Sequence, residues 1–387
     1  MSEVKDRDVI LIVDDTPANI QIAQSILKNE YKIRVATSGA KALELVKAKP
    51  RPALVLLDVE MPGMDGYEVC KQLKADAHTR DIPVIFLTGR TETADETRGF
   101  EEGAVDYIHK PFSPAVMKAR VHTHLVLREA REQLARQLLT INKELEMARQ
   151  IQLSILPRET PKFRGLDIAA RYVPMSSVAG DFYDFIIVDE QHVGILVADV
   201  SGHGLPAALI ASMLQVAFAA QHAHASEPGS VLSGLNGALC GKFLTDFVTA
   251  AYVFVDMEKN SISYSAAGHP PLLLWRRSTG SATEITENGL LLGHFPEETY
   301  SAIQLPLEAD DKVVLYTDAI LEARNSSQEM FGVDRFKQFL EIHHTLGPNE
   351  LSDALLDELS LWSGESGGGG QQDDITIVVI HLKTEDH

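Results

Sequence analysis

The sequence contains very little cysteine, and this scarcity excludes two ways of stabilising a fold. Its two cysteines, Cys70 and Cys240, are far apart and belong to no CxxC pair or short Cys/His spacing, whereas disulfide frameworks and structural zinc sites need clustered ligands. The fold must therefore depend on a hydrophobic core, and 45% hydrophobic against 23% charged residues is typical of a soluble globular protein. Because 387 residues exceed what one core usually organises, we expect two domains.

Positive charge is also scarce. The 35 lysines and arginines are outnumbered by 55 aspartates and glutamates, which gives a formal net charge of −20 at pH 7. Binding to nucleic acid or to an anionic membrane favours a basic surface, so we expect neither partner. An excess of carboxylates instead suits a protein that holds divalent cations.

Long apolar runs are missing as well. The first residues, MSEVKDRDVI, are charged and do not have the layout of a signal peptide. No apolar stretch approaches the roughly 20 residues that a membrane-spanning helix needs. We therefore expect a cytoplasmic protein.

From residue 9 to about 125, short β-branched runs alternate with amphipathic helical stretches. The expected strands are residues 9–13, 32–36, 53–57, 83–87 and 106–110. Strands that alternate with helices predict a doubly wound α/β domain with a parallel sheet, which we place at residues 5–125. Functional sites in this layout gather at the carboxyl ends of the strands.

Residues that can bind a metal ion or take part in catalysis stand at the carboxyl ends of these strands. Asp14 and Asp15 close the first strand, Asp58 the third, Thr88 the fourth and Lys110 the fifth. Three carboxylates in one crevice repel one another unless a hard cation such as Mg²⁺ binds them. The lysine and the hydroxyl can complete a phosphoryl-binding pocket, in which Asp58 acts as the nucleophile.

The motifs VDD, LLDVEMPGMDG, LTGR and YIHKPF occur in this order along the segment and resemble the receiver domain of response regulators. The resemblance implies that Asp58 is phosphorylated by a sensor histidine kinase or a small phosphodonor. The site residues it implies are Asp15, Asp58 and the Glu60 backbone carbonyl for Mg²⁺, Asp14 for a water-mediated contact, Thr88 and Tyr107 as the switch pair, and Lys110, before a cis Pro111, as the phosphate contact.

A stretch without glycine, from about residue 115 to 156, follows this domain. Its apolar residues recur at spacings of three and four: Leu127, Leu134, Leu138, Ile141, Leu145, Ala148 and Ile155. Arg131 and Gln152 fill the intervening positions of the same seam. A heptad pattern of about four repeats predicts a long helix, residues 126–157, that forms a coiled coil in a homodimer. A single helix packed on its own domain is the alternative, because Arg131 is costly to bury.

After Pro157 the pattern changes to long strands with helices among them, and VDEQHV and DMEKNS indicate hairpin turns. This predicts an α+β domain, residues 158–387, in which helices cover a β-sandwich. Four acidic motifs, GDFYDF, ADVSGHG, YTDAILEA and QQDDITIVV, stand at strand ends or beside glycine. Each aspartate alone is typical of a turn, but carboxylates from separate strands can together hold the two divalent cations of a two-metal phosphatase.

These motifs, in their order and in their residues, resemble those of the bacterial PPM-type (PP2C-like) serine/threonine phosphatases of the sporulation and stress-response class. The segment ARQIQLSILP ahead of them is part of the resemblance. The resemblance extends from about residue 145 to 383. It implies two Mn²⁺ or Mg²⁺ ions, with Asp374 left open as an alternative to Asp373 and with Gly268 and His269 shaping a loop nearby. The ligands it implies are Asp181, Asp199, the Val200 backbone carbonyl, Asp318 and Asp373.

His203 is the other polar residue of the ADVSGHG motif. It lies four residues after Asp199, whereas distant eukaryotic relatives place a histidine two residues after their bridging aspartate. A general acid must reach the leaving oxygen. We therefore expect His203 to fix the loop before a helix that starts at Leu205, with general acid as its alternative role.

The sequence thus predicts a two-component response regulator in which phosphorylation of Asp58 controls a metal-dependent phosphoserine/phosphothreonine protein phosphatase. The resemblance implies a phosphorylated anti-sigma-factor antagonist as the substrate. The alternative is a non-enzymatic regulator whose phosphatase-like domain only binds a partner. An anti-sigma kinase output is not indicated, because neither an asparagine box nor a glycine-rich ATP lid is evident.

Overall fold

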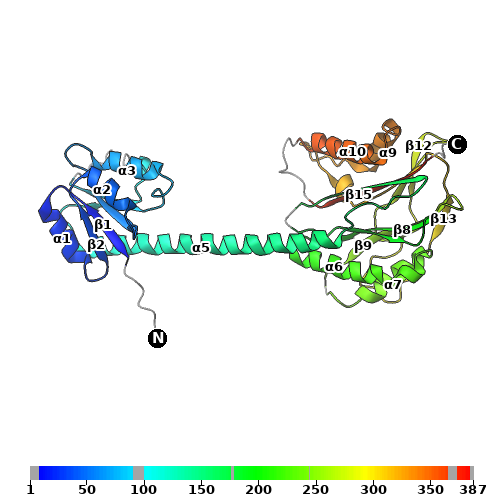
Figure 1. Ribbon diagram of the computed structural model, residues 1–387, viewed down its shortest axis with the longest axis horizontal. Coiled ribbons are helices and arrows are strands. Elements are labelled where there is room, and N and C mark those ends of the chain that lie inside the picture. The colour runs from blue at the N-terminus through cyan, green and yellow to red at the C-terminus, as the bar shows by residue number, and fades with distance from the viewer. Residues whose placement is uncertain (1–7, 90–99, 176–177, 244, 365–372, 384–387) are drawn as a thin grey trace. The chain divides into compact units, whose positions relative to one another are not determined.

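The computed structural model describes the chain except for residues 1–7, 90–99, 176–177, 244, 365–372 and 384–387. It divides into two compact units, residues 1–140 and 141–387, which are coloured from blue to cyan and from cyan to red in Figure 1. None of the described helices combines the length and the hydropathy that a membrane crossing requires.

A parallel five-stranded sheet forms the centre of the first unit. Its strands, in the order β2-β1-β3-β4-β5, are β1 (Val9–Val13), β2 (Lys32–Ala36), β3 (Leu54–Asp58), β4 (Val84–Thr88) and β5 (Asp106–His109). Every residue of β1, β3 and β4 is buried, because a parallel sheet is covered on both faces. The doubly wound α/β prediction is confirmed, and the expected strands are shifted by at most one residue.

Helices cover both faces of this sheet. α2 (Gly39–Lys47) and α3 (Gly66–Ala75) pack on one face, where Val46 and Leu73 are buried. α1 (Pro17–Leu27) and the first turns of α5 (Pro114–Ile155) pack on the other, where Leu27 and Val121 are buried. The carboxyl ends of the strands are left open between these two layers, where the predicted acidic residues stand.

α5 is one continuous helix of 42 residues. It begins at Pro114, within the segment that the sequence assigns to the first domain. Its predicted seam residues Leu127, Leu134, Leu138 and Ile141 are each 49–56% exposed, so this part of the seam is open, whereas the later seam residue Gln152 is buried. The long helix is as predicted, whereas its pairing with a second helix stays a prediction.

The second unit contains two antiparallel five-stranded sheets that pack face to face. One sheet, in the order β13-β10-β9-β8-β7, contains β7 (Phe182–Ile187), β8 (His192–Val200), β9 (Val248–Asp256), β10 (Ser261–Ala267) and β13 (Ile303–Pro306). The other, in the order β12-β11-β14-β15-β6, contains β6 (Leu166–Val173), β11 (Leu272–Arg276), β12 (Ser281–Ile285), β14 (Lys312–Tyr316) and β15 (Ile375–Leu382).

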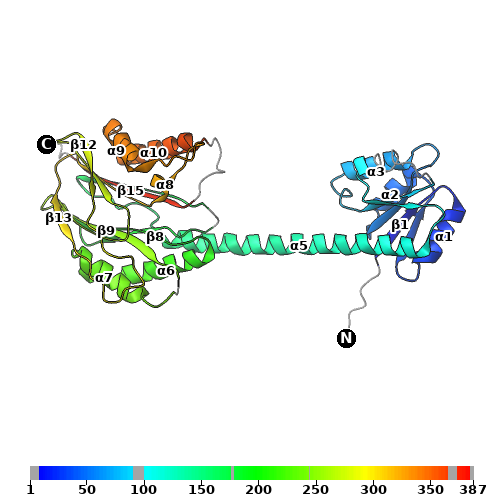
Figure 2. The same ribbon diagram turned by 180° about the vertical axis from the view of Figure 1, so that it is seen from behind.

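Helices form the outer layers of this sandwich, as the sequence predicted (Figures 1 and 2). α6 (Leu205–Ala219) and α7 (Pro228–Leu239) lie on the first sheet, with the short 3-10 helix η1 (His222–His224) between them in the chain. α8 (Ala319–Glu322), α9 (Gly332–Ile342) and α10 (Pro348–Ser363) belong to the second sheet.

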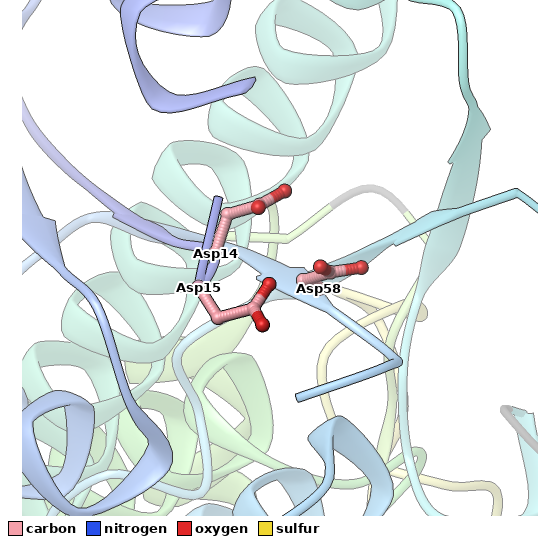
Figure 3. Close-up of side chains that lie close together, drawn as sticks. All are labelled: Asp14, Asp15 and Asp58. Carbon is pink, nitrogen blue, oxygen red and sulfur yellow. The ribbon is translucent and has the colours of Figure 1, made fainter. Parts of the chain in front are cut away.

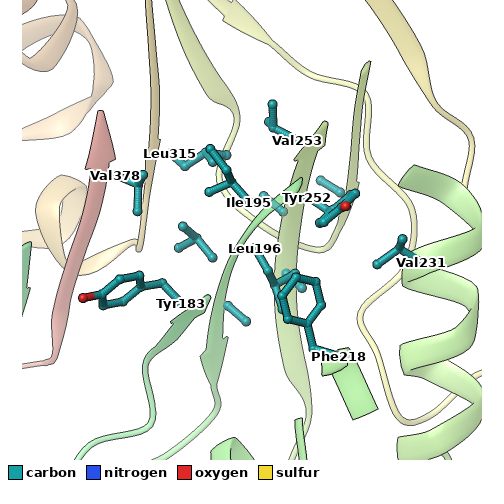
Figure 4. Packing of buried hydrophobic residues seen from close by; sticks show 14 of the residues in the cluster. Tyr183, Ile195, Leu196, Phe218, Val231, Tyr252, Val253, Leu315 and Val378 are labelled. Carbon is teal, nitrogen blue, oxygen red and sulfur yellow. The ribbon is translucent and has the colours of Figure 1, made fainter. Parts of the chain in front are cut away.

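In the core of the second unit, successive residues of a strand point to opposite faces of the sheet. Ile195 of β8 points between the two sheets toward Leu315 and Val378, while the next residue, Leu196, points toward Phe218 of α6 (Figure 4). Both faces of β8 are therefore buried, and apolar side chains fill the spaces on each side. This packing fixes the ends of β7, β8, β14 and β15 with respect to one another.

Replacing Leu196 by alanine tests the importance of this packing. Leu196 is fully buried, so Leu196→Ala should lower the free energy of unfolding of the second unit by about 2–5 kcal/mol. Chemical denaturation followed by tryptophan fluorescence measures this unit alone, because Trp275 and Trp362 are the only tryptophans. The control Leu361→Ala, at a residue that is 78% exposed, should change the value little, and equal losses in the two variants would contradict the packing described.

Candidate functional site

Three carboxylates meet at the carboxyl end of the parallel sheet (Figure 3). Asp14 and Asp15 follow β1 and Asp58 ends β3, and one carboxylate oxygen from each lies within 4.8 Å of the others. Burial raises the pKa of Asp58 to about 6, a hydrogen bond from Lys110 opposes this effect, and the charge of Asp14 adds to it. Three oxygen donors of like charge at this spacing fit a hard divalent cation such as Mg²⁺.

Lys110 and two backbone segments complete the first site. The Lys110 Nζ lies 2.8 Å from Asp14 Oδ2 and 2.9 Å from Asp58 Oδ1, and the Lys110–Pro111 peptide is cis, as expected. The Glu60 backbone N–H donates to the Asp58 carboxylate. The loop after β3 then turns back so tightly that a Cβ on Gly66 would lie 2.3 Å from the Asp58 carbonyl oxygen.

The predicted switch residues lie on β4, which pairs with β3, and on β5, which pairs with β4. Thr88 ends β4 and is 8% exposed, and Tyr107 lies on the neighbouring strand β5. The Tyr107 ring contacts His109 edge-on, and the Arg120 guanidinium lies 5.5 Å from its centre. The structure therefore brings the three acids, Thr88 and Lys110 to the carboxyl end of the sheet, with Tyr107 two residues before the end of β5, while the roles of all these residues stay predictions.

The predicted acids of the second unit also share one end of its sandwich. Asp181 directly precedes β7 and Asp199 lies near the end of β8, so both stand at the same end of the first sheet. Asp318 follows β14 and Asp373 precedes β15, at one end of the second sheet. A hydrogen bond from Thr317 Oγ1 to Asp181 Oδ2, of 2.9 Å, joins the two ends.

Asp181 is the most deeply buried of these acids. Its Oδ2 accepts hydrogen bonds from Thr317 Oγ1 and, at 2.6 Å, from Thr376 Oγ1. Burial, and then the charge of Asp199, raise its pKa well above the usual range.

Asp199 interacts electrostatically both with Asp181 and with the acids of the second sheet. Burial raises its pKa to about 7, and the charges of Asp318, Asp373 and Asp374 add to this effect. Among the described residues, three carboxylates within 4.8 Å of one another occur only in the first unit, so the second set is more widely spaced. Two cations about 3.5–4 Å apart spread their ligands over a wider region than one ion does.

The adjacent Asp373 and Asp374 have different environments. Asp374 is buried, and its two carboxylate oxygens accept the backbone N–H groups of Met175 and Gly180, each at 2.7 Å. Asp373 is exposed, and its Oδ1 accepts the backbone N–H of Asp374. Asp374 therefore holds a backbone segment, whereas Asp373 lies at the exposed side of the site.

Gly180 brings the chain close to the expected backbone ligand. A Cβ at this position would lie 2.7 Å from the Val200 carbonyl oxygen and 3.4 Å from that of Gly202, so only glycine allows Asp181 to follow at this distance. The sequence pointed to this glycine, which stands before the acid in GDFYDF, but it gave no signal for Thr317 and Thr376.

The two histidines near this site differ in burial. His203 is exposed, and Gly202 and Gly204 on either side of it have φ values of 87° and 80°, so these glycines account for the unusual backbone of the loop. His269, after Gly268 with φ 64°, is 2% exposed, and burial lowers its pKa to about 3. Its Nδ1 lies 2.9 Å from the Oγ1 of Thr249, the residue paired with Asp199 across β8 and β9.

Comparison with known proteins gives relatives for both halves of the chain. Phosphoserine phosphatase RsbU of Bacillus subtilis is 29% identical over 244 residues, which cover 63% of this chain and 71% of RsbU. A probable cyclic di-GMP phosphodiesterase of Vibrio cholerae is 51% identical over 128 residues, 33% of this chain. The match covers only 29% of that relative, so the chain spans less than a third of its length.

A solved structure shares the fold of the second unit. The SiaA-PP2C domain of Pseudomonas aeruginosa is 25% identical and superposes with a TM-score of 0.57, covering 64% of this chain and 99% of that domain. The response regulator receiver domain model matches residues 10–122, and the stage II sporulation protein E (SpoIIE) model matches residues 189–383, half of the chain. The chain therefore belongs to the SpoIIE family, with a receiver domain followed by a phosphatase domain of the PP2C fold.

Proposed function

We propose that the chain is a response regulator in which phosphorylation of Asp58 controls a metal-dependent phosphoserine/phosphothreonine protein phosphatase. The observation that carries this proposal is the gathering of Asp181, Asp199, Asp318 and Asp373 at one end of two packed sheets. Of these like charges Asp181 is buried and Asp199 and Asp318 are half-buried, so the set is stable only if protons or cations neutralise it. The name of RsbU, a phosphoserine phosphatase, supports the same reaction.

The donors of this site fit two Mn²⁺ or Mg²⁺ ions. Asp181, Asp199, Asp318, Asp373 and the Val200 carbonyl are all oxygen ligands, which hard cations prefer. We choose Asp373 over Asp374, because both oxygens of Asp374 accept backbone N–H groups. When bound, the cations activate water and stabilise charge on the phosphoryl oxygens.

The surrounding residues orient these ligands. The hydroxyls of Thr317 and Thr376 fix one oxygen of Asp181, so its other oxygen is directed toward Asp199 and the ions. Asp374 fixes the backbone of Gly180 and thereby the position at which Asp181 leaves the chain. A site prepared in this way loses little free energy on reorganisation when a phosphoester binds.

The receiver domain supplies the control. In the proposed reaction an oxygen of Asp58 attacks the phosphorus of a phosphohistidine in a sensor kinase, or of a small phosphodonor. An aspartyl phosphate forms as the P–N bond of the phosphohistidine, or the P–O bond of the phosphodonor, breaks, and the histidine or the dephosphorylated donor leaves. Lys110 would contact the phosphoryl group, and Asp15, Asp58 and the Glu60 carbonyl would hold a Mg²⁺ ion that neutralises its charge, with Asp14 acting through a water. Thr88 and Tyr107 then change position as the switch pair.

The substrate and the partner copy are further parts of this proposal. The resemblance to stress-response phosphatases favours a phosphorylated anti-sigma-factor antagonist as the substrate. The half-exposed seam of Leu127, Leu134, Leu138 and Ile141 on α5 supports a homodimer through this helix. A non-enzymatic regulator is the alternative function, and the absence of turnover would favour it.

Replacing Asp199 by asparagine tests the catalytic proposal. The change removes a charge that stabilises the cations, and at about 1.4 kcal/mol per tenfold in rate a loss of several kcal/mol lowers turnover by at least about 100-fold. The measurement is Mn²⁺-dependent hydrolysis of a phosphoserine peptide, with a chelator as a second control. Glu190→Gln, at the exposed turn between the same two strands, should keep full activity. Undiminished hydrolysis by Asp199→Asn would refute the two-metal site.

Phosphorylation of the receiver tests the proposed control. Wild-type protein treated with acetyl phosphate, or with beryllium fluoride as an aspartyl-phosphate mimic, should hydrolyse the same peptide at a rate changed by about 5-fold or more. Asp58→Asn should not respond, because it lacks the accepting carboxylate. Equal rates with and without the mimic in the wild-type protein would show that the receiver does not control the phosphatase.

A further inference from the structure

Tyr172 lies near the end of β6, beside the acids of the second unit. It pairs with Thr376 across β6 and β15, so the two side chains lie on the same face of the second sheet. Thr376 donates its hydroxyl to Asp181, which precedes β7 of the first sheet, so this face is the one that looks into the sandwich. The ring of Tyr172 accordingly lies 6.3 Å from that of Tyr183 on β7, measured between the ring centres.

The hydroxyl of Tyr172 is buried, and none of the described residues offers it a hydrogen-bond partner. Burial, and then the charges of Asp374 and Asp181, raise the pKa of this phenol above its usual value, so the group keeps its proton and can act as a donor. A buried donor without a partner destabilises a fold, and such groups are rare in proteins. The position of this hydroxyl therefore indicates an acceptor that the described residues do not supply.

The carboxylate oxygens closest to the sandwich interior already have donors. Oδ2 of Asp181 accepts the hydroxyls of Thr317 and Thr376, and each oxygen of Asp374 accepts a backbone N–H group. The other oxygen of Asp181 is assigned to the cations by the proposed function. The acceptor left for Tyr172 is therefore an oxygen that enters the site together with the cations, and hard divalent cations in proteins commonly keep some of their water ligands.

We propose that Tyr172 is a positioning residue of the metal site in the second unit, whose hydroxyl donates a hydrogen bond to a water ligand of the proposed cations. This inference rests on the proposed function of the four acids as metal ligands. A phenol suits this position because it donates a hydrogen bond without bringing a positive charge next to the cations. Its hydroxyl gains a partner only when cations are bound, so it favours the cation-bound state of the site over the metal-free state.

Tyr172→Phe removes only the hydroxyl and tests this inference. Binding is measured by calorimetry with Mn²⁺, on the full-length chain that also carries Asp15→Asn, which weakens binding at the receiver site. The variant should bind Mn²⁺ about 10-fold more weakly than this parent, as expected for loss of a residue that orients a metal ligand. Without Mn²⁺, its thermal unfolding midpoint, followed by tryptophan fluorescence, should equal or exceed that of the parent, because an unpartnered buried donor has been removed.

Tyr316→Phe is the matched control. The Tyr316 hydroxyl is also buried, and it too has no partner among the residues that the structure describes. Its ring instead packs edge-on against Phe336 of α9, on the outer face of the second sheet. Tyr316→Phe should therefore keep the Mn²⁺ affinity of the parent, and an equal loss of affinity in the two variants would contradict a specific role for Tyr172.

The remaining outcomes separate this inference from the proposed function. Unchanged Mn²⁺ affinity in Tyr172→Phe, in a protein whose Mn²⁺ binding is lost in Asp199→Asn, would overturn this inference alone. A lower unfolding midpoint of Tyr172→Phe without Mn²⁺ would also overturn it, because the hydroxyl would then have a partner in the metal-free fold. Mn²⁺ binding that Asp199→Asn leaves intact would overturn the proposed function itself.

Discussion

Repulsion between buried carboxylates is the constraint on which both units depend. Asp58 in the receiver domain and Asp199 in the phosphatase domain have their pKa values raised to about 6 and about 7, in each case mainly by burial. A fold that brings such groups together loses stability unless a cation or a proton neutralises them. The geometry of both sites follows from the need to keep these charges at a strand end, where the backbone is open and a cation can enter.

The two sites meet this constraint with different partners. The receiver site uses an internal cation, since the Lys110 ammonium lies within 3 Å of oxygens of both Asp14 and Asp58. The phosphatase site uses hydroxyls instead, and Thr317 and Thr376 bind the most deeply buried acid, Asp181. A fixed lysine suits the proposed uptake of one phosphoryl group, whereas the proposed two-cation site needs carboxylates that no lysine neutralises.

Strand ends were the part of both sites that the sequence could predict. Hydrophobic periodicity locates a strand to within a residue or two, and an acid after the strand then has a known place at the edge of the sheet. Tertiary hydrogen bonds are not encoded in this way. Asp373 and Asp374 are equivalent in the sequence, and only bonds to Met175 and Gly180, almost 200 residues earlier, distinguish them. The heptad spacing put Gln152 on the seam that pairs with a second helix, whereas its side chain is buried and donates a hydrogen bond to the Ala179 carbonyl. Heptad spacing cannot indicate where a helix stops pairing with another helix and packs on a domain instead.

The central claim is that the four acids at the end of the sandwich form a two-cation site. Crystals grown with Mn²⁺ and measured at the manganese absorption edge test it most directly, since anomalous scattering locates the ions without assumptions about the ligands. The account predicts two anomalous peaks within coordination distance of Asp181, Asp199, Asp318 and Asp373, with Asp374 still bound to the backbone. A map without peaks among these carboxylates, at Mn²⁺ concentrations that support hydrolysis, would contradict it.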